Sequence, residues 1–186
     1  MNIGKKIFEI FLLCFLIVPA LLLITAVCLM LFLPNKGKVF FKQKRIGLGG
    51  KEFTVFKFRT LTFPIEVNIE KDPDTIKMNS HPVGIFLRKT GLDEILQLIN
   101  VLKGDMYLIG PRPLIKKDLD HLTEYQFMRR HEIKPGIVGL WQIRRKYNDD
   151  SSYFKYDDFY IRNHSLSLDI FIVYSTIEYM LKRKGR

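Results

Sequence analysis

Cysteine is scarce in this chain, with 2 residues among 186, and this scarcity excludes a small fold held together by disulfides. Cys14 and Cys28 lack CxxC spacing and lie inside an apolar stretch, so we interpret both as small apolar side chains. No metal-ligand spacing relates the four histidines either, which argues against a zinc site at His81, His121, His131 or His164. Internal repeats and low-complexity runs are also lacking.

Acidic residues are outnumbered, because 30 Lys and Arg stand against 19 Asp and Glu and leave a formal net charge of +11. Such an excess points to partners that carry phosphate: nucleic acid, anionic lipid or a nucleotide substrate. The aromatic and basic segment 39–59 could stack on bases, but no RRM, KH or helix-turn-helix pattern is present. A membrane-tethered nucleic-acid binder is therefore a rival hypothesis, and salt-dependent binding would support it, but we expect no nucleic-acid partner.

Charge is almost absent from residues 7–34, where Glu9 is the one charged side chain. About 20 apolar residues are enough for a helix to cross a bilayer, and this stretch is longer. A signal peptide has a shorter apolar region and a small-residue cleavage site, which Pro34-Asn35-Lys36 does not provide. The sequence thus predicts a retained membrane segment over residues 1–36 and a globular domain over residues 37–186.

The residues alone do not decide how this segment passes through the membrane. Lys5 and Lys6 precede it and Lys36 and Lys38 follow it, and the positive-inside rule would place both flanks in the cytoplasm. Pro19 near the middle removes a helical hydrogen bond. A helix that enters, breaks at Pro19 and returns satisfies both observations. A helix that crosses the bilayer with a proline kink is the alternative.

The rest of the chain has the pattern of a compact, helix-rich α/β fold, with 47% hydrophobic residues overall. Residues 39–45 and 53–59 flank a glycine cluster and predict a β-hairpin; the cluster lacks phosphate-loop spacing. Residues 62–80 predict a surface loop. Apolar periodicity predicts helices over 92–103, 115–131, 151–162 and 167–183. The last suits an amphipathic helix on an anionic membrane surface, or a core helix with a solvated tail.

A pair of carboxylates opens the predicted 92–103 helix, in the run Thr90-Gly91-Leu92-Asp93-Glu94. The local interpretation is that Thr90 caps the helix and Asp93 is its capping-box carboxylate. The functional interpretation uses the same place: the positive end of a helix favours an ionised carboxylate and attracts phosphates. Two adjacent carboxylates near Arg88 could then hold Mg²⁺ and attack a phosphorus atom.

Arg112 stands between two prolines in Gly110-Pro111-Arg112-Pro113. Prolines fix the backbone and so aim one guanidinium, which suits recognition of a phosphate. A rigid turn with an incidental arginine is the alternative. Residues 134–142, with the single tryptophan, predict a second rigid loop.

With these motifs in place, the sequence resembles the bacterial sugar transferases, the monotopic phosphoglycosyl transferases that start glycan assembly on polyprenyl phosphate. The resemblance covers nearly the whole chain and is most specific in residues 87–106, running into Gly110-Pro111-Arg112-Pro113. The remaining matching motifs are the basic start with the proline-broken apolar segment, 39–47, 56–60, 135–137 with 139–142, and Asn163-His164-Ser165 with Asp169.

The resemblance implies a reaction: transfer of a sugar phosphate from a UDP-sugar to polyprenyl phosphate, with release of UMP, as the first membrane step of glycan synthesis. It implies Mg²⁺ as cofactor, a re-entrant membrane segment and a site on the cytoplasmic face of the bacterial plasma membrane. Asp93 matches the nucleophile, which forms a phosphosugar–aspartyl intermediate, and Glu94 its partner. The residues implied around the substrates are Arg88, Arg112, Lys57, Arg59 and Asp169.

The sequence departs from the family pattern at several positions. Val18 stands where Ser often precedes the proline, and Glu9 stands where Asp is favoured. The family's small-residue–Gly–Arg run is replaced here by Ile143-Arg144-Arg145-Lys146-Tyr147. Lys146 would therefore offer the donor a single point charge where an arginine offers a planar, two-pronged guanidinium. The donor sugar and a homo-oligomeric state stay open. The main rival hypothesis is a catalytically inactive, membrane-bound scaffold for other glycan enzymes.

Overall fold

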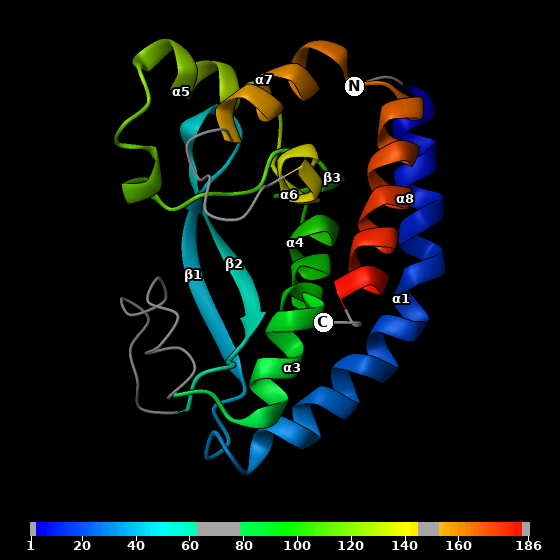
Figure 1. Cartoon of the computed structure of the whole chain (residues 1–186), viewed down its shortest axis with the longest axis vertical. Coiled ribbons are helices and arrows are strands. Elements are labelled where there is room, and N and C mark those ends of the chain that lie inside the picture. The colour runs from blue at the N-terminus through cyan, green and yellow to red at the C-terminus, as the bar shows by residue number, and fades with distance from the viewer. Residues whose placement is uncertain (1–2, 63–78, 145–152, 184–186) are drawn as a thin grey trace. The chain divides into compact units, whose positions relative to one another are not determined.

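A computed structural model describes residues 3–62, 79–144 and 153–183 of the chain (Figure 1). It is rich in helices and contains a short antiparallel hairpin, so the predicted mixed α/β class is confirmed. The elements in chain order are α1 (Ile3–Phe32), β1 (Phe40–Ile46), η1 (Leu48–Gly50), β2 (Glu52–Phe58), α3 (Pro82–Thr90), η3 (Leu92–Gln97), α4 (Leu98–Leu102), β3 (Tyr107–Ile109), η4 (Lys116–Leu119), α5 (Glu124–Arg130), β4 (Gly136–Val138), α6 (Leu140–Arg144), α7 (Tyr153–Asn163) and α8 (Leu166–Arg183).

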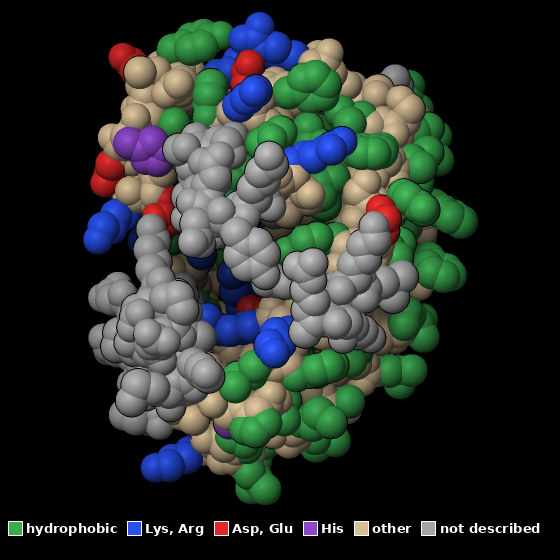
Figure 2. Space-filling view, in the orientation of Figure 1, with side chains coloured by type: hydrophobic (Ala, Val, Ile, Leu, Met, Phe, Trp, Pro, Cys, Tyr) green, Lys and Arg blue, Asp and Glu red, His purple; other side chains and the backbone are tan. Residues whose placement is uncertain are grey.

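The apolar stretch forms one helix, α1, which stays helical through Pro19. An 18-residue window within its segment Lys6–Phe32 has a mean hydropathy of 3.0, and this is the one helix among the described residues that is long and apolar enough to cross a membrane. Large apolar side chains cover its surface, as Figure 2 shows, and Phe15, Leu22 and Leu29 are each more than 70% exposed. The helix is therefore built for an apolar environment. Its predicted re-entrant path stays a prediction.

Contacts divide the chain into two compact units. Unit 1 comprises Met1–Cys14, Gln43–Val55 and Gln97–Arg186, and unit 2 comprises Phe15–Lys42 and Phe56–Leu96. The predicted boundary at residue 36 stays a prediction.

The core of unit 2 forms where α1, the hairpin and α3 bury their apolar faces. Its buried members are Val27, Leu31, Val39, Phe58, Leu87 and Leu96. Asn35, fully buried in the turn after α1, donates from Nδ2 to the carbonyl of Arg59 at 2.8 Å. This bond ties the end of the apolar helix to the end of β2.

Unit 1 is organised around a short parallel pair of strands, β3 and β4, in which Tyr107 pairs with Gly136 and Ile109 with Val138. A Cβ on Gly136 would lie 2.1 Å from the Gly110 nitrogen, so only glycine permits this approach. One apolar cluster of this unit is centred on Ile109, Tyr160 and Ile172, and a second contains Ile46, Leu119 and Trp141.

Several predicted helices are shorter or more irregular than expected. The helix predicted over 92–103 begins as the 3-10 helix η3 and becomes α-helical only in α4. The helix predicted over 115–131 is divided into η4 and α5, while α7 and α8 agree closely with prediction. Strand β4 and the start of helix α6 lie in the segment 134–142, for which a rigid loop is predicted, and β3 lies just before the predicted rigid turn at 110–113. Most of the predicted loop 62–80 falls outside the described residues.

Candidate functional site

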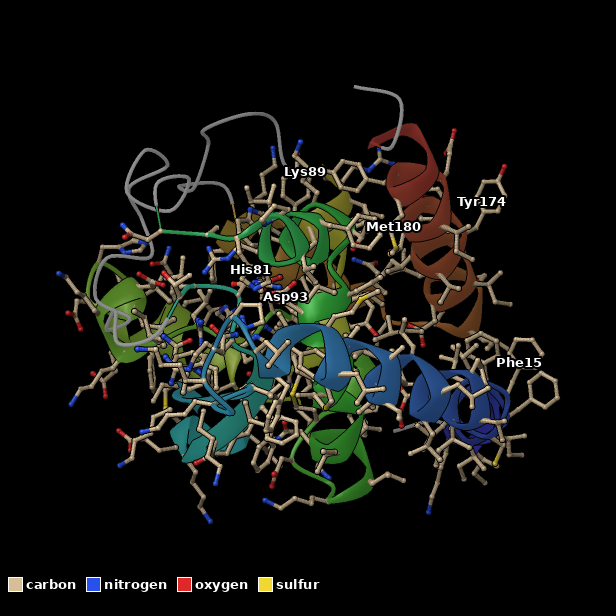
Figure 3. All side chains as sticks on the ribbon, turned by 90° about the horizontal axis from the view of Figure 1, so that it is seen from below. Phe15, His81, Lys89, Asp93, Tyr174 and Met180 are labelled. Atoms are coloured by element: carbon tan, nitrogen blue, oxygen red, sulfur yellow. The ribbon has the colours of Figure 1, made fainter. Side chains whose placement is uncertain are left out.

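The two carboxylates lie in the first turn of η3, directly after α3, and Figure 3 labels Asp93 there. Gly91 adopts a left-handed conformation, with φ of 72°, and ends α3. Thr90 is therefore the last residue of α3, and its hydroxyl donates to the Phe86 carbonyl at 2.9 Å. The predicted N-cap role of Thr90 is wrong, because the glycine closes one helix before the next begins. The predicted position of Asp93 and Glu94 in a first helical turn is confirmed.

Glu94 is held by a lysine from the hairpin. Lys57 on β2 donates from Nζ to Oε1 of Glu94 at 2.9 Å, and the two side chains are only 13% and 14% exposed. A pair so largely removed from water has a stronger attraction than a surface pair. The bond fixes the position of the Glu94 carboxylate. Asp93, the preceding residue, is half-buried like Glu94.

Arg88 on α3 is oriented by a buried threonine. Its Nε donates to Oγ1 of Thr60 at 2.6 Å. The helix comes close to Thr60 because Gly84 has no side chain: a Cβ there would lie 2.2 Å from the Thr60 carbonyl oxygen. Arg59 lies one residue before Thr60, with its guanidinium 5.8 Å from the centre of the Phe41 ring. Unit 2 thus carries three of the predicted basic residues together with both carboxylates.

The other predicted site residues lie elsewhere in the chain. Arg112 belongs to unit 1, is half-buried and follows β3. Asp169, also of unit 1, is fully buried and accepts a hydrogen bond from the Tyr160 hydroxyl at 2.7 Å. Lys146 falls outside the described residues.

The burial of Asp169 changes the interpretation of its role. A carboxylate with no exposed surface, bonded to a buried tyrosine, suits fixing α8 against α7 better than contact with a soluble donor. Burial raises the pKa of Tyr160, and the charges of Asp169 and Glu9 raise it further. The tyrosine therefore keeps its proton, and its hydroxyl donates a hydrogen bond to Asp169.

The carboxylates fit a magnesium ion that is shared with a substrate. Among the described residues no group of three or more His, Cys, Asp or Glu side chains could hold a metal by itself. Mg²⁺ is commonly bound by one or two carboxylates together with substrate phosphates and water, however. Asp93 and Glu94 supply that number of carboxylates, so the donor set fits Mg²⁺ brought with a diphosphate.

Sequence reasoning missed two buried polar residues that follow the carboxylates in the chain. Asn100 is fully buried and donates from Nδ2 to the Thr54 carbonyl at 2.7 Å, within unit 1. Gln97 is 2% exposed. A signal was available, since both are polar positions in an otherwise apolar run, Ile95 to Leu102. Both residues come after the two carboxylates in the chain, Gln97 at the end of η3 and Asn100 in α4.

Comparisons with known proteins agree with the resemblance seen in the sequence. A family model described as bacterial sugar transferase matches residues 1–183. The chain is 42% identical to the uncharacterized sugar transferase EpsL of Bacillus subtilis (strain 168), over 98% of this chain and 90% of that protein.

Two further relatives carry more specific names. One, from Aeromonas hydrophila, is a UDP-N-acetylgalactosamine-undecaprenyl-phosphate N-acetylgalactosaminephosphotransferase, 40% identical over 88% of this chain. The other, from Salmonella typhimurium (strain LT2), is an undecaprenyl-phosphate galactose phosphotransferase, 34% identical over 89% of this chain. The chain spans 40% and 39% of the lengths of these two proteins. The predicted enzyme class, a sugar transferase, is confirmed, and the chain belongs to the bacterial sugar transferase family.

Proposed function

We propose that this protein transfers a sugar 1-phosphate from a UDP-sugar to polyprenyl phosphate and releases UMP. The observation that carries the proposal is the carboxylate pair Asp93-Glu94 in the first turn of η3, with Lys57 bonded to Glu94 at 2.9 Å. The names of the relatives support the same reaction type, because they include undecaprenyl-phosphate phosphotransferases for N-acetylgalactosamine and galactose.

The proposed chemistry has two displacements at one phosphorus atom. A carboxylate oxygen of Asp93 bonds to the phosphorus that bears the sugar, and the bond to the bridging oxygen breaks, so that UMP leaves with that electron pair. A phosphate oxygen of the polyprenyl acceptor then bonds to the same phosphorus. The bond to Asp93 breaks, which restores the carboxylate and yields polyprenyl diphosphate sugar.

The neighbouring groups have distinct parts in this scheme. Lys57 holds the Glu94 carboxylate, and Arg88, oriented by Thr60, supplies positive charge for the donor phosphates. Arg112, Arg59 and Lys146 are assigned to substrate binding by the resemblance. When Mg²⁺ is bound by Asp93 and Glu94, it would neutralise charge on the diphosphate.

We further propose that the protein works at the cytoplasmic face of the bacterial plasma membrane. Support comes from α1, whose surface is apolar, and from α8, which exposes Ile170, Tyr174 and Ile177 although its Ile172 is buried in the core. Figure 3 shows Phe15 and Tyr174 projecting from α1 and α8 respectively. A helix that is apolar on its outer side suits the boundary between lipid and water.

The test is UMP release from a panel of UDP-sugars with Mg²⁺, with and without polyprenyl phosphate. We expect turnover that requires the lipid, and a loss of at least about 10³-fold in Asp93→Asn, because the amide is a far weaker nucleophile. The exposed Asp120 provides the matched control, and Asp120→Asn should keep wild-type turnover. Without the lipid, labelled sugar phosphate should attach to the wild type and not to Asp93→Asn.

Full turnover in Asp93→Asn would overturn the nucleophile assignment. A folded wild type that releases no UMP from any donor would favour the inactive membrane scaffold instead.

A further inference from the structure

The loop that carries Arg112 is held by its carbonyl groups to an unusual degree. From Ile109 to Leu114, five backbone carbonyls accept hydrogen bonds from five different residues of unit 1. The donors are the Tyr160 hydroxyl to Ile109 at 3.2 Å, the Gly136 amide to Pro111 at 2.8 Å, Arg130 Nη2 to Arg112, Arg45 Nη1 to Pro113 at 3.3 Å and the Ile46 amide to Leu114 at 3.0 Å.

The two prolines explain why side chains supply the hydrogen bonds to the Arg112 and Pro113 carbonyls. Pro111 and Pro113 have no N–H group, so neither can donate to β4 past Gly110, whose amide bonds to the Val138 carbonyl at 2.9 Å, and the Pro111 carbonyl still accepts from the Gly136 amide. Beyond that point the carbonyls of Arg112 and Pro113 would lack strand partners. Two arginines fill this place, and both are buried, Arg130 at 2% and Arg45 at 9% exposure.

Arg130 is itself fixed by a buried carboxylate. Its Nε donates to Oδ2 of Asp157 on α7 at 2.9 Å, and both side chains are 2% exposed. One guanidinium therefore joins α5, α7 and the peptide of Arg112. A charged donor that has no contact with water is too deeply placed to meet a soluble substrate itself.

Arg129, the neighbour of Arg130 on α5, has different partners and is more exposed. Arg129 pairs with Asp158 at 3.2 Å and contacts Glu132, with side chains that are 20% to 50% exposed, and among the described residues its guanidinium makes no hydrogen bond to the Arg112 loop. The two neighbours on α5 thus pair with two neighbouring aspartates on α7, one pair buried and bonded to the loop and the other at the surface. Arg129 is a matched control for Arg130.

We propose that Arg130, fixed by Asp157, is a positioning residue that sets the orientation of Arg112 for the donor phosphates. The proposal rests on the proposed function, in which Arg112 binds a phosphate. Arg130 acts by holding the Arg112 carbonyl, so that the guanidinium of Arg112 begins from a fixed backbone. Correct placement of a binding group by a fixed backbone lowers the ordering cost of substrate binding.

A double-mutant cycle tests this route through Arg112. We compare UMP release in wild type, Arg130→Gln, Arg112→Lys and the double variant, with Arg129→Gln as control. Arg130→Gln should lower kcat/KM by about tenfold or more in the wild type, mainly through KM, and by less than about twofold when Arg112 is already changed. Arg130→Lys, which keeps the charge and one donor, should restore part of the loss. Arg129→Gln should keep wild-type kcat/KM.

Amide hydrogen exchange supplies a readout that needs no substrate. Arg130→Gln should speed exchange in residues 107–114, and Arg129→Gln should leave it unchanged, because Arg130, and not Arg129, bonds to a carbonyl of the loop. Asp157→Asn keeps an oxygen acceptor for Arg130 and takes the place of Arg130→Gln if that variant does not fold. Equal losses of kcat/KM in both backgrounds, or unchanged exchange in the loop, would overturn the proposal. A wild type without UMP release would refute the proposed function, while the exchange measurement would still decide whether Arg130 orders the loop.

Discussion

Two ion pairs of this protein have similar lengths and very different surroundings. Lys57 and Glu94 in unit 2 are 2.9 Å apart and keep 13% and 14% of their surface exposed, whereas Arg130 and Asp157 in unit 1 are 2.9 Å apart and keep 2% each. The first pair, the open pair, keeps some contact with solvent, and its Glu94 is the chain neighbour of Asp93, so it can respond to a substrate. The second pair, the sealed pair, has almost no contact with solvent, so it can only hold the backbone. Burial separates the pair suited to chemistry from the pair suited to support.

The largest effect on stability is expected where the sealed pair is broken. Asp157→Ala leaves the Arg130 charge buried without its carboxylate, and such a loss costs about 3–5 kcal/mol of unfolding free energy. Asp158→Ala is the control, because Asp158 pairs with Arg129 and Arg162 nearer the surface, and it should cost roughly 1 kcal/mol or less. Denaturant unfolding in detergent measures both values. Equal costs would contradict the distinction between the two pairs.

A pH effect of intermediate size is expected beside the sealed pair. His131 is buried, and burial lowers its pKa from 6.5 to about 4, with the Phe127 carbonyl opposing and Arg130 adding to the shift. Below pH 6.5 the unfolded chain takes up a proton that the folded chain refuses, so stability present above pH 6.5 is lost as the pH falls toward 4. The loss attributable to His131 is about 3 kcal/mol.

The His131 contribution has to be isolated, because burial raises the pKa of Asp157 to about 6 and gives the opposite trend over the same pH range. His131→Phe removes the histidine and keeps an aromatic ring beside Phe127, whose ring centre lies 4.4 Å away. Its unfolding free energy relative to wild type should rise steadily between pH 6.5 and 4. A constant difference across that range would show that His131 does not titrate as its burial demands.

The sequence predicted the parts of the fold that depend on local pattern. The apolar run gave α1, alternating aromatic and basic residues gave the hairpin, and apolar periodicity gave α8. Strands β3 and β4 could not be predicted in this way, because each is three residues long and they pair across residues 107 and 136. Their glycines and prolines suggested rigid loops, and those same residues turn out to permit the close approach of the two strands.

The candidate site also has features that the sequence predicted and features that it did not. The place of Asp93 and Glu94 in a first helical turn followed from sequence, since it is a local property. The partner of Glu94 did not, because Lys57 is 37 residues away, and neither did the burial of Asp169. Contacts between distant residues are set by packing, which no local pattern records.

The smallest effect on stability, and a large one on activity, is expected at the open pair. Lys57→Met keeps the stem that packs in the hairpin and removes the ammonium from Glu94, which should cost about 1–3 kcal/mol, less than the loss of Asp157, because this pair is less completely buried. UMP release should fall at least about tenfold, because Glu94 loses the group that holds it beside the nucleophile. Lys44→Met is the control: Lys44 pairs with Glu52 at 3.0 Å with 78% and 49% exposure, so both stability and turnover should stay near wild type. If Lys57→Met destabilised the protein as much as Asp157→Ala while turnover per folded molecule stayed unchanged, the open pair would be structural, and the comparison between the two pairs would fail on its functional side.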